Sequence, residues 1–118
     1  MIVDDDSRIT EPMEELFSDE GYEVRVVNVS RFAVPTAAFW KPDAVLLDLE
    51  MPGLDGVEVL GELRSHPEVK ETPVVVLSVL ARNLDGPPGN VQGFLCKPIS
   101  FQEILACVRQ VLQTVPAV

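Results

Sequence analysis

Several ionisable and hydroxyl side chains stand directly after short apolar runs, where they could act together. Asp48 follows a run of four apolar residues, and Asp4 and Asp5 follow three apolar residues at the start of the chain. Ser78 and Lys97 end two further runs. Carboxylates, a hydroxyl and an ammonium suit a site for a divalent cation and a phosphoryl group. Each residue alone has a simpler explanation, such as capping a loop, so the chemistry depends on whether the fold brings them together.

The runs themselves are short and rich in Val and Leu, which is typical of strands buried on both faces. Turn residues separate these runs from segments with helical spacing of apolar residues. We therefore expect strands over residues 1–3, 22–29, 44–48, 74–77 and 93–96.

Helices are expected between the strands. Ser7 is a candidate N-cap of the first helix, but Pro12 predicts that this helix either starts near Thr10 or is kinked. Gly21 should end it. Further helices are expected near 34–40, over 57–65 and after Ser100, whereas Gly86-Pro87-Pro88-Gly89 predicts that a helix between the last two strands is short or irregular.

This alternation predicts an α/β fold, namely a single doubly wound five-stranded parallel sheet with helices on both faces. In a flavodoxin-like sheet of order 2-1-3-4-5, the carboxyl ends of strands one, three, four and five lie side by side. Three carboxylates would then share a cleft with Ser78 and Lys97, and they would repel one another without a cation such as Mg²⁺. Asp48 would suit a nucleophile that forms an aspartyl phosphate.

Composition and net charge exclude several classes of function. The 118 residues fit one domain, 1–118, and 47% apolar residues suffice for a core. A net charge of −10 argues against direct binding to nucleic acid or to an anionic membrane. No apolar run approaches a membrane span, and from the acidic first residues we expect no signal peptide. Cys96 and Cys107 are expected to be buried thiols and His66 a surface residue, so we expect a reduced, cytoplasmic protein.

Four segments together resemble the receiver domain of two-component response regulators, and the resemblance covers essentially the whole chain. The segments are Val3–Asp6, Pro42–Gly56, Val76–Ser78 and Gly93–Pro98. The resemblance implies the strand order 2-1-3-4-5. It also implies a phosphoryl donor, which would be a phosphohistidine on a sensor histidine kinase or on a histidine phosphotransfer protein.

Residue roles follow from this resemblance. Asp48 would be the phosphoacceptor, and Mg²⁺ would be held by Asp4, Asp5, Asp48 and the backbone carbonyl of Glu50. The carboxylate of Glu50 would lie near the path of hydrolytic water.

The remaining roles concern the phosphoryl group and the switch. Lys97 would pair with the phosphoryl group, and Ser78 would be the switch hydroxyl. Phe94 matches the aromatic residue that changes rotamer with Ser78, although a plain core Phe is an alternative. Pro98 is expected to follow a cis peptide bond.

Three features depart from the family, and one of them is a very short first strand, which is expected to cost stability at the centre of the sheet. Val79 stands where Ala or Gly is usual, which predicts slower phosphorylation by small donors and a longer-lived phosphoryl group. The irregular segment before the fifth strand falls on the usual dimerisation and output surface, so a homodimer through it is doubtful.

Other functions remain open. A degenerate receiver would act as a phosphorylation-independent interaction module. A metal-dependent phosphatase with an Asp nucleophile would need an Asp at position 50, where this chain has Glu. We expect a signalling switch that catalyses only its own phosphorylation and dephosphorylation, and not an enzyme in the usual sense. The sequence identifies neither the kinase nor the downstream target.

Overall fold

The computed structural model of the chain describes residues 1–51, 56–79 and 91–114. Five parallel strands form one sheet in the order β2-β1-β3-β4-β5, which confirms the predicted order. The strands are β1 (Ile2–Val3), β2 (Val26–Val27), β3 (Val45–Asp48), β4 (Val74–Ser78) and β5 (Gly93–Cys96).

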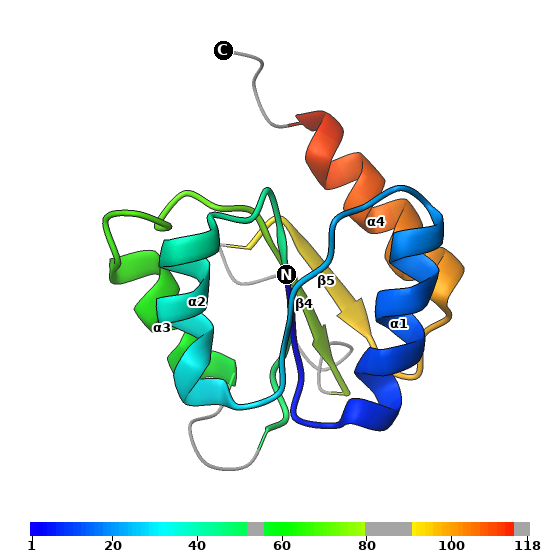
Figure 1. Cartoon of the computed structure of the whole chain (residues 1–118), viewed down its shortest axis with the longest axis horizontal. Coiled ribbons are helices and arrows are strands. Elements are labelled where there is room, and N and C mark those ends of the chain that lie inside the picture. Colours follow the sequence, from blue (N-terminus) through cyan, green and yellow to red (C-terminus); the bar gives the residue numbers. More distant parts are fainter. Residues whose placement is uncertain (52–55, 80–90, 115–118) are drawn as a thin grey trace.

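Helices cover both faces of the sheet, as predicted. Helices α2 and α3 lie on one side, and α1 and α4 lie on the other (Figure 1). None of the helices in the described ranges is long and apolar enough to cross a membrane. The expected short or irregular helix between β4 and β5 falls mainly on residues 80–90, outside the described residues. The helices are α1 (Ser7–Asp19), the 3-10 helix η1 (Ser30–Phe32), α2 (Ala33–Trp40), α3 (Gly56–Ser65) and α4 (Phe101–Thr114).

Two apolar cores explain why the central strands are continuously apolar. Val45 and Leu47 of β3 face the core shared with α2 and α3, whereas Leu46 between them faces the core shared with α1 and α4. Val75 and Val76 of β4 divide in the same way. Because successive side chains of a strand point to opposite faces, a strand covered on both sides needs apolar residues throughout.

The second strand is shorter than predicted. Residues 22–29 were expected to form a strand, but only Val26–Val27 does. Strand β2 lies at the edge of the sheet and pairs only with β1, which itself has two residues. An edge strand cannot extend its ladder beyond its partner, so the length of β1 sets the length of β2.

The start of α1 also differs from the prediction. The helix begins at Ser7 and runs through Pro12, so it does not start near Thr10. Its N-cap is Asp6, not Ser7, since the Asp6 carboxylate accepts a hydrogen bond from the backbone N–H of Arg8 at 3.0 Å. The Arg8 side chain binds the same carboxylate through two nitrogens, each at 3.1 Å. Gly21, with a φ of 93°, follows the end of the helix as expected.

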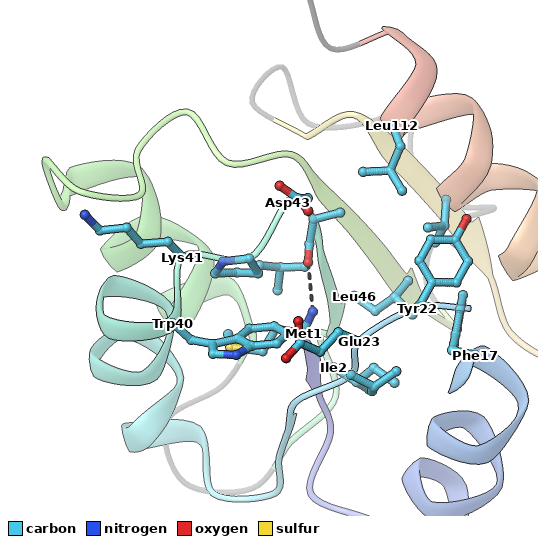
Figure 2. A pocket seen from close by; sticks show the side chains of 15 residues that line it. Met1, Ile2, Phe17, Tyr22, Glu23, Trp40, Lys41, Asp43, Leu46 and Leu112 are labelled. Carbon is cyan, nitrogen blue, oxygen red and sulfur yellow. Dashed lines mark hydrogen bonds between the residues drawn. The ribbon is translucent and has the colours of Figure 1, made fainter. Parts of the chain in front are cut away.

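The amino-terminal edge of the sheet carries a mainly apolar hollow of about 260 Å³, lined in part by Ile2, Trp40 and Leu46 (Figure 2). Trp40 packs against the core, in line with its predicted covering role, and the guanidinium carbon of Arg25 lies 5.5 Å from the centroid of its ring. This edge lies at the opposite ends of the strands from Asp48. In open α/β sheets, ligands bind at the carboxyl ends of the strands, so we assign no function to the hollow.

The two cysteines are free thiols, as expected. Both are half-buried, however, and the prediction that they are buried was wrong. Cys96 is the last residue of β5, an edge strand that pairs with β4 on one side.

Two glycines of α3 predict opposite effects on stability. A Cβ on Gly56 would lie 2.4 Å from the backbone oxygen of Asp48 and 2.4 Å from the Cα of Leu49, whereas a Cβ on Gly61 meets nothing within 4 Å. We expect Gly56→Ala to lower the free energy of unfolding by about 2 kcal/mol, because backbone atoms cannot give way. Gly61→Ala should raise it by about 0.5–1 kcal/mol through helix propensity. Urea unfolding measures both, and equal effects would contradict this packing.

Candidate functional site

Three carboxylates meet at the carboxyl edge of the sheet. Strands β1 and β3 are neighbours, and Val3 lies opposite Leu47. The residues that come next after these two, Asp4 and Asp48, therefore lie side by side. Asp4 and Asp48 are each 3% exposed, while Asp5 is exposed. Each residue offers a carboxylate oxygen, and these oxygens lie within 4.8 Å of one another. The sequence prediction that these residues share one place is therefore confirmed by the geometry.

Two residues that the sequence reasoning did not single out for the site hold Asp4 in place. The backbone N–H of Asp6 donates to Asp4 Oδ1 at 3.0 Å. The side chain of Asn28 donates to the backbone oxygen of Asp4 at 2.7 Å and to the buried hydroxyl of Thr10 at 3.1 Å. Asp6 could have been noticed as the third consecutive aspartate, but Asn28 offered no signal in the sequence.

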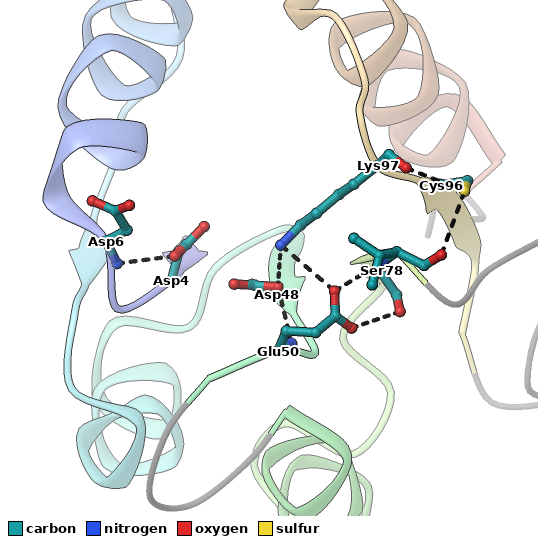
Figure 3. A network of polar contacts seen from close by, with 8 residues as sticks. Asp4, Asp6, Asp48, Glu50, Ser78, Cys96 and Lys97 are labelled. Carbon is teal, nitrogen blue, oxygen red and sulfur yellow. Dashed lines mark hydrogen bonds and ion pairs between the residues drawn. The ribbon is translucent and has the colours of Figure 1, made fainter.

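The side chain of Lys97 extends from the end of β5 to the carboxylate of Asp48. Ser78 of β4 pairs with Cys96 of β5, so Lys97 follows directly beside the end of β4. Its Nζ lies 2.6 Å from Asp48 Oδ1, which also accepts a hydrogen bond from the backbone N–H of Glu50 at 3.0 Å (Figure 3). The peptide bond between Lys97 and Pro98 is cis, as expected.

The electrostatics of Lys97 reflect this placement. Burial lowers the pKa of Lys97, but the hydrogen bond and charge of Asp48, with the charges of Glu50 and Asp4, raise it by more. The net pKa lies above the usual value, so the ammonium stays protonated at neutral pH.

The Glu50 carboxylate, in contrast, lies where the sequence reasoning did not place it. Ser78 Oγ donates to Glu50 Oε2 at 2.6 Å, and the backbone N–H of Val79 donates to Glu50 Oε1 at 2.8 Å. Lys97 Nζ lies 3.8 Å from the same Oε1. Figure 3 shows the carboxylate between the lysine and the end of β4. The sequence had suggested a backbone role for Glu50 and a side chain near hydrolytic water, not a contact with the switch hydroxyl.

The two remaining candidates lie beside this group. Phe94 is half-buried and packs against the core under α2 and α3, opposite Val76 in the neighbouring strand. This position fits both a core residue and a rotamer switch, so its switching role stays a prediction. Val79 follows Ser78 with half of its surface exposed.

The carboxylate cluster fits a hard divalent cation. Burial raises the pKa of Asp4 to about 6, and the charges of Asp48 and Asp5 add to this against the Asp6 hydrogen bond and Lys97. A carboxylate in this position is therefore unfavourable without a nearby positive charge. Oxygen ligands on adjacent carboxylates are the ligands that Mg²⁺ takes in proteins, so the donor set and its charge both suit such an ion.

A parallel sheet of this order, with an acidic cluster and a lysine at its carboxyl edge, defines the class of receiver domains. A family model described as the response regulator receiver domain matches residues 1–109. The chain belongs to this family, whose members are signalling switches of two-component systems.

Individual relatives agree with this assignment. The response regulator MprA of Mycolicibacterium vanbaalenii is 34% identical over 116 residues, which cover 96% of this chain and 49% of that protein. MprA of Mycobacterium leprae is also 34% identical, with 96% and 50% covered. The chain thus spans about half the length of the curated relatives it matches.

Solved structures share the fold. Chemotaxis protein CheY4 of Vibrio cholerae has a TM-score of 0.79 at 26% identity, covering 93% of this chain and 94% of that chain. The receiver domain of sensor histidine kinase PA1611 of Pseudomonas aeruginosa has a TM-score of 0.81 at 25% identity, covering 96% and 95%. That domain was solved with a magnesium ion coordinated in its active-site cleft.

The raised pKa of Asp4 predicts that this carboxylate destabilises the metal-free protein at neutral pH. An ordinary Asp ionises near pH 4 when unfolded, whereas Asp4 ionises near 6 when folded. The cost of the charged form therefore grows as the pH rises from about 4 to about 6 and is fully present at pH 7. With EDTA at pH 7, Asp4→Asn should raise the free energy of unfolding by about 2 kcal/mol.

The same substitution should have little effect near pH 4, and saturating Mg²⁺ should stabilise the wild type more than the variant. Urea unfolding at both pH values measures this, with Glu62→Gln, which removes an exposed carboxylate of α3, as the control. A variant less stable than the wild type in EDTA at pH 7 would show that the charge of Asp4 does not destabilise the metal-free protein.

Proposed function

We propose that residues 1–118 are one receiver domain that accepts a phosphoryl group on Asp48 with Mg²⁺ and acts in the cytoplasm. The donor would be a phosphohistidine of a sensor histidine kinase or of a histidine phosphotransfer protein. One observation carries the proposal. The buried Asp48 carboxylate lies 2.6 Å from the Lys97 ammonium, and its oxygen lies within 4.8 Å of carboxylate oxygens of Asp4 and Asp5.

Asp48 would be the nucleophile. A carboxylate oxygen of Asp48 attacks the phosphorus, and the new O–P bond forms as the P–N bond to the donor imidazole breaks. The electron pair of that bond stays with the imidazole nitrogen. Lys97 balances negative charge on the transferring oxygens, and the contacts of Asp48 with Lys97 and with the Glu50 N–H fix its carboxylate plane.

A bound Mg²⁺ would neutralise further charge on the phosphoryl oxygens. Asp4, Asp5, Asp48 and the backbone carbonyl of Glu50 would hold it. The domain would catalyse only its own phosphorylation and dephosphorylation. Its output would follow from Ser78 turning toward the phosphoryl group and from Phe94 changing rotamer with it.

The phosphoacceptor role predicts a result with a stable analogue. Beryllofluoride with Mg²⁺ should bind the wild type and give bound resonances in fluorine NMR. Asp48→Asn should abolish this binding, since the neutral amide cannot bond to beryllium. Asp43→Asn, which removes an exposed carboxylate before β3, should bind as the wild type does. A folded wild-type protein that binds no beryllofluoride would favour a phosphorylation-independent interaction module instead.

Val79 gives a separate prediction about access. Its side chain is half-exposed next to Ser78, and a smaller residue there would leave small phosphoryl donors a wider path to Asp48. We expect Val79→Ala to be phosphorylated several-fold faster by acetyl phosphate and to lose the phosphoryl group faster. Intact-protein mass spectrometry over time measures both rates. Unchanged rates would show that Val79 does not limit access.

A further inference from the structure

Two hydrogen bonds and one longer ion pair converge on one carboxylate at the end of β4. Ser78 Oγ and the Val79 N–H each bind a different oxygen of Glu50, at 2.6 Å and 2.8 Å. Lys97 Nζ approaches the second of these oxygens at 3.8 Å. A hydroxyl, a backbone N–H and an ammonium arranged around one anion form an anion-binding cradle. We define this donor set as the Ser78 cradle.

The Ser78 cradle lies next to the position where a phosphoryl group on Asp48 would stand. Lys97 belongs to both groups, since its Nζ is also 2.6 Å from Asp48 Oδ1. Ser78 is 1% exposed, so its hydroxyl has little access to water as a substitute partner. A phosphoryl group on Asp48 therefore needs donors that the Glu50 carboxylate already occupies.

From this we infer that Glu50 is an internal anion that occupies the Ser78 cradle and must be displaced when Asp48 is phosphorylated. The inference rests on the proposed function. Glu50 is a positioning residue here, because it acts by holding Ser78, the Val79 N–H and Lys97. The chain thus contains its own competitor for the phosphoryl group, two residues after the acceptor.

Displacement is physically accessible. The side chain of Glu50 is 35% exposed, so a rotamer change moves its carboxylate into water without burying it elsewhere. A phosphoryl group also brings negative charge next to the carboxylate, and this repulsion favours the released state. Before phosphorylation, the same contacts stabilise the resting position of Ser78. The apparent affinity for the phosphoryl group is therefore lower than the intrinsic affinity, because only the molecules in which the cradle is free can bind it.

Two substitutions separate the contact from the charge. Glu50→Asp keeps the charge but is one methylene too short to reach both donors, whereas Glu50→Gln keeps the length and removes the charge. At saturating Mg²⁺ we expect both variants to bind beryllofluoride about tenfold more tightly than the wild type, because charge-assisted hydrogen bonds no longer oppose binding. Glu62→Gln, which removes an exposed carboxylate of α3, should leave the affinity unchanged.

A tighter Glu50→Gln with a Glu50→Asp that matches the wild type would overturn the inference, since charge alone would then explain the effect. Unchanged affinity in both variants would overturn it as well.

A second readout does not depend on phosphorylation. In the metal-free protein, the Val79 amide proton should resonate downfield because it donates to a carboxylate, and both Glu50 variants should move it upfield. If the wild type binds no beryllofluoride, the proposed function fails, and this shift still decides whether Glu50 holds the cradle. A Val79 resonance that stays in place in both variants would overturn the inference.

Discussion

The contact between Lys97 and Asp48 is the interaction on which the site depends. Nζ and Oδ1 lie 2.6 Å apart, at an edge where two other aspartates bring oxygens within 4.8 Å of the Asp48 oxygen. Three carboxylates alone would repel one another. Burial is the main cause of the raised pKa of Asp4, and the charges of Asp48 and Asp5 add to it. The ammonium offsets some of this repulsion, and a divalent cation would offset more. Without a divalent cation, the three carboxylates at this edge of the sheet therefore remain electrostatically unfavourable despite Lys97.

The fold is what makes such an arrangement possible. Apolar cores on both faces hold β3 and β4 rigidly, so the residues at their carboxyl ends have little freedom of position. Parallel pairing places the ends of β1, β3, β4 and β5 at one edge, although their residues are far apart in the sequence. Gly56 lets the start of α3 pack directly against the backbone of Asp48 and Leu49, because a side chain there would collide with that backbone.

Much of this could be predicted from the sequence. The apolar runs predicted the strands, and their terminal residues predicted which side chains meet. The side chain of Glu50 could not be placed, because its position depends on donors from Ser78 and Lys97, which lie on two other strands. The length of β2 depends on its partner rather than on its own β-branched residues. The capping role of Asp6 was missed because Ser7 is an equally good cap by residue type.

Chemical trapping identifies the residue that carries the phosphoryl group. The protein is phosphorylated with acetyl phosphate and Mg²⁺, reduced with tritiated borohydride and digested for peptide mapping by mass spectrometry. Borohydride reduces an aspartyl phosphate to homoserine, so we expect one labelled residue, at position 48. Label at any other position, or a folded protein that takes no label from acetyl phosphate or from a phosphohistidine donor, would contradict this expectation.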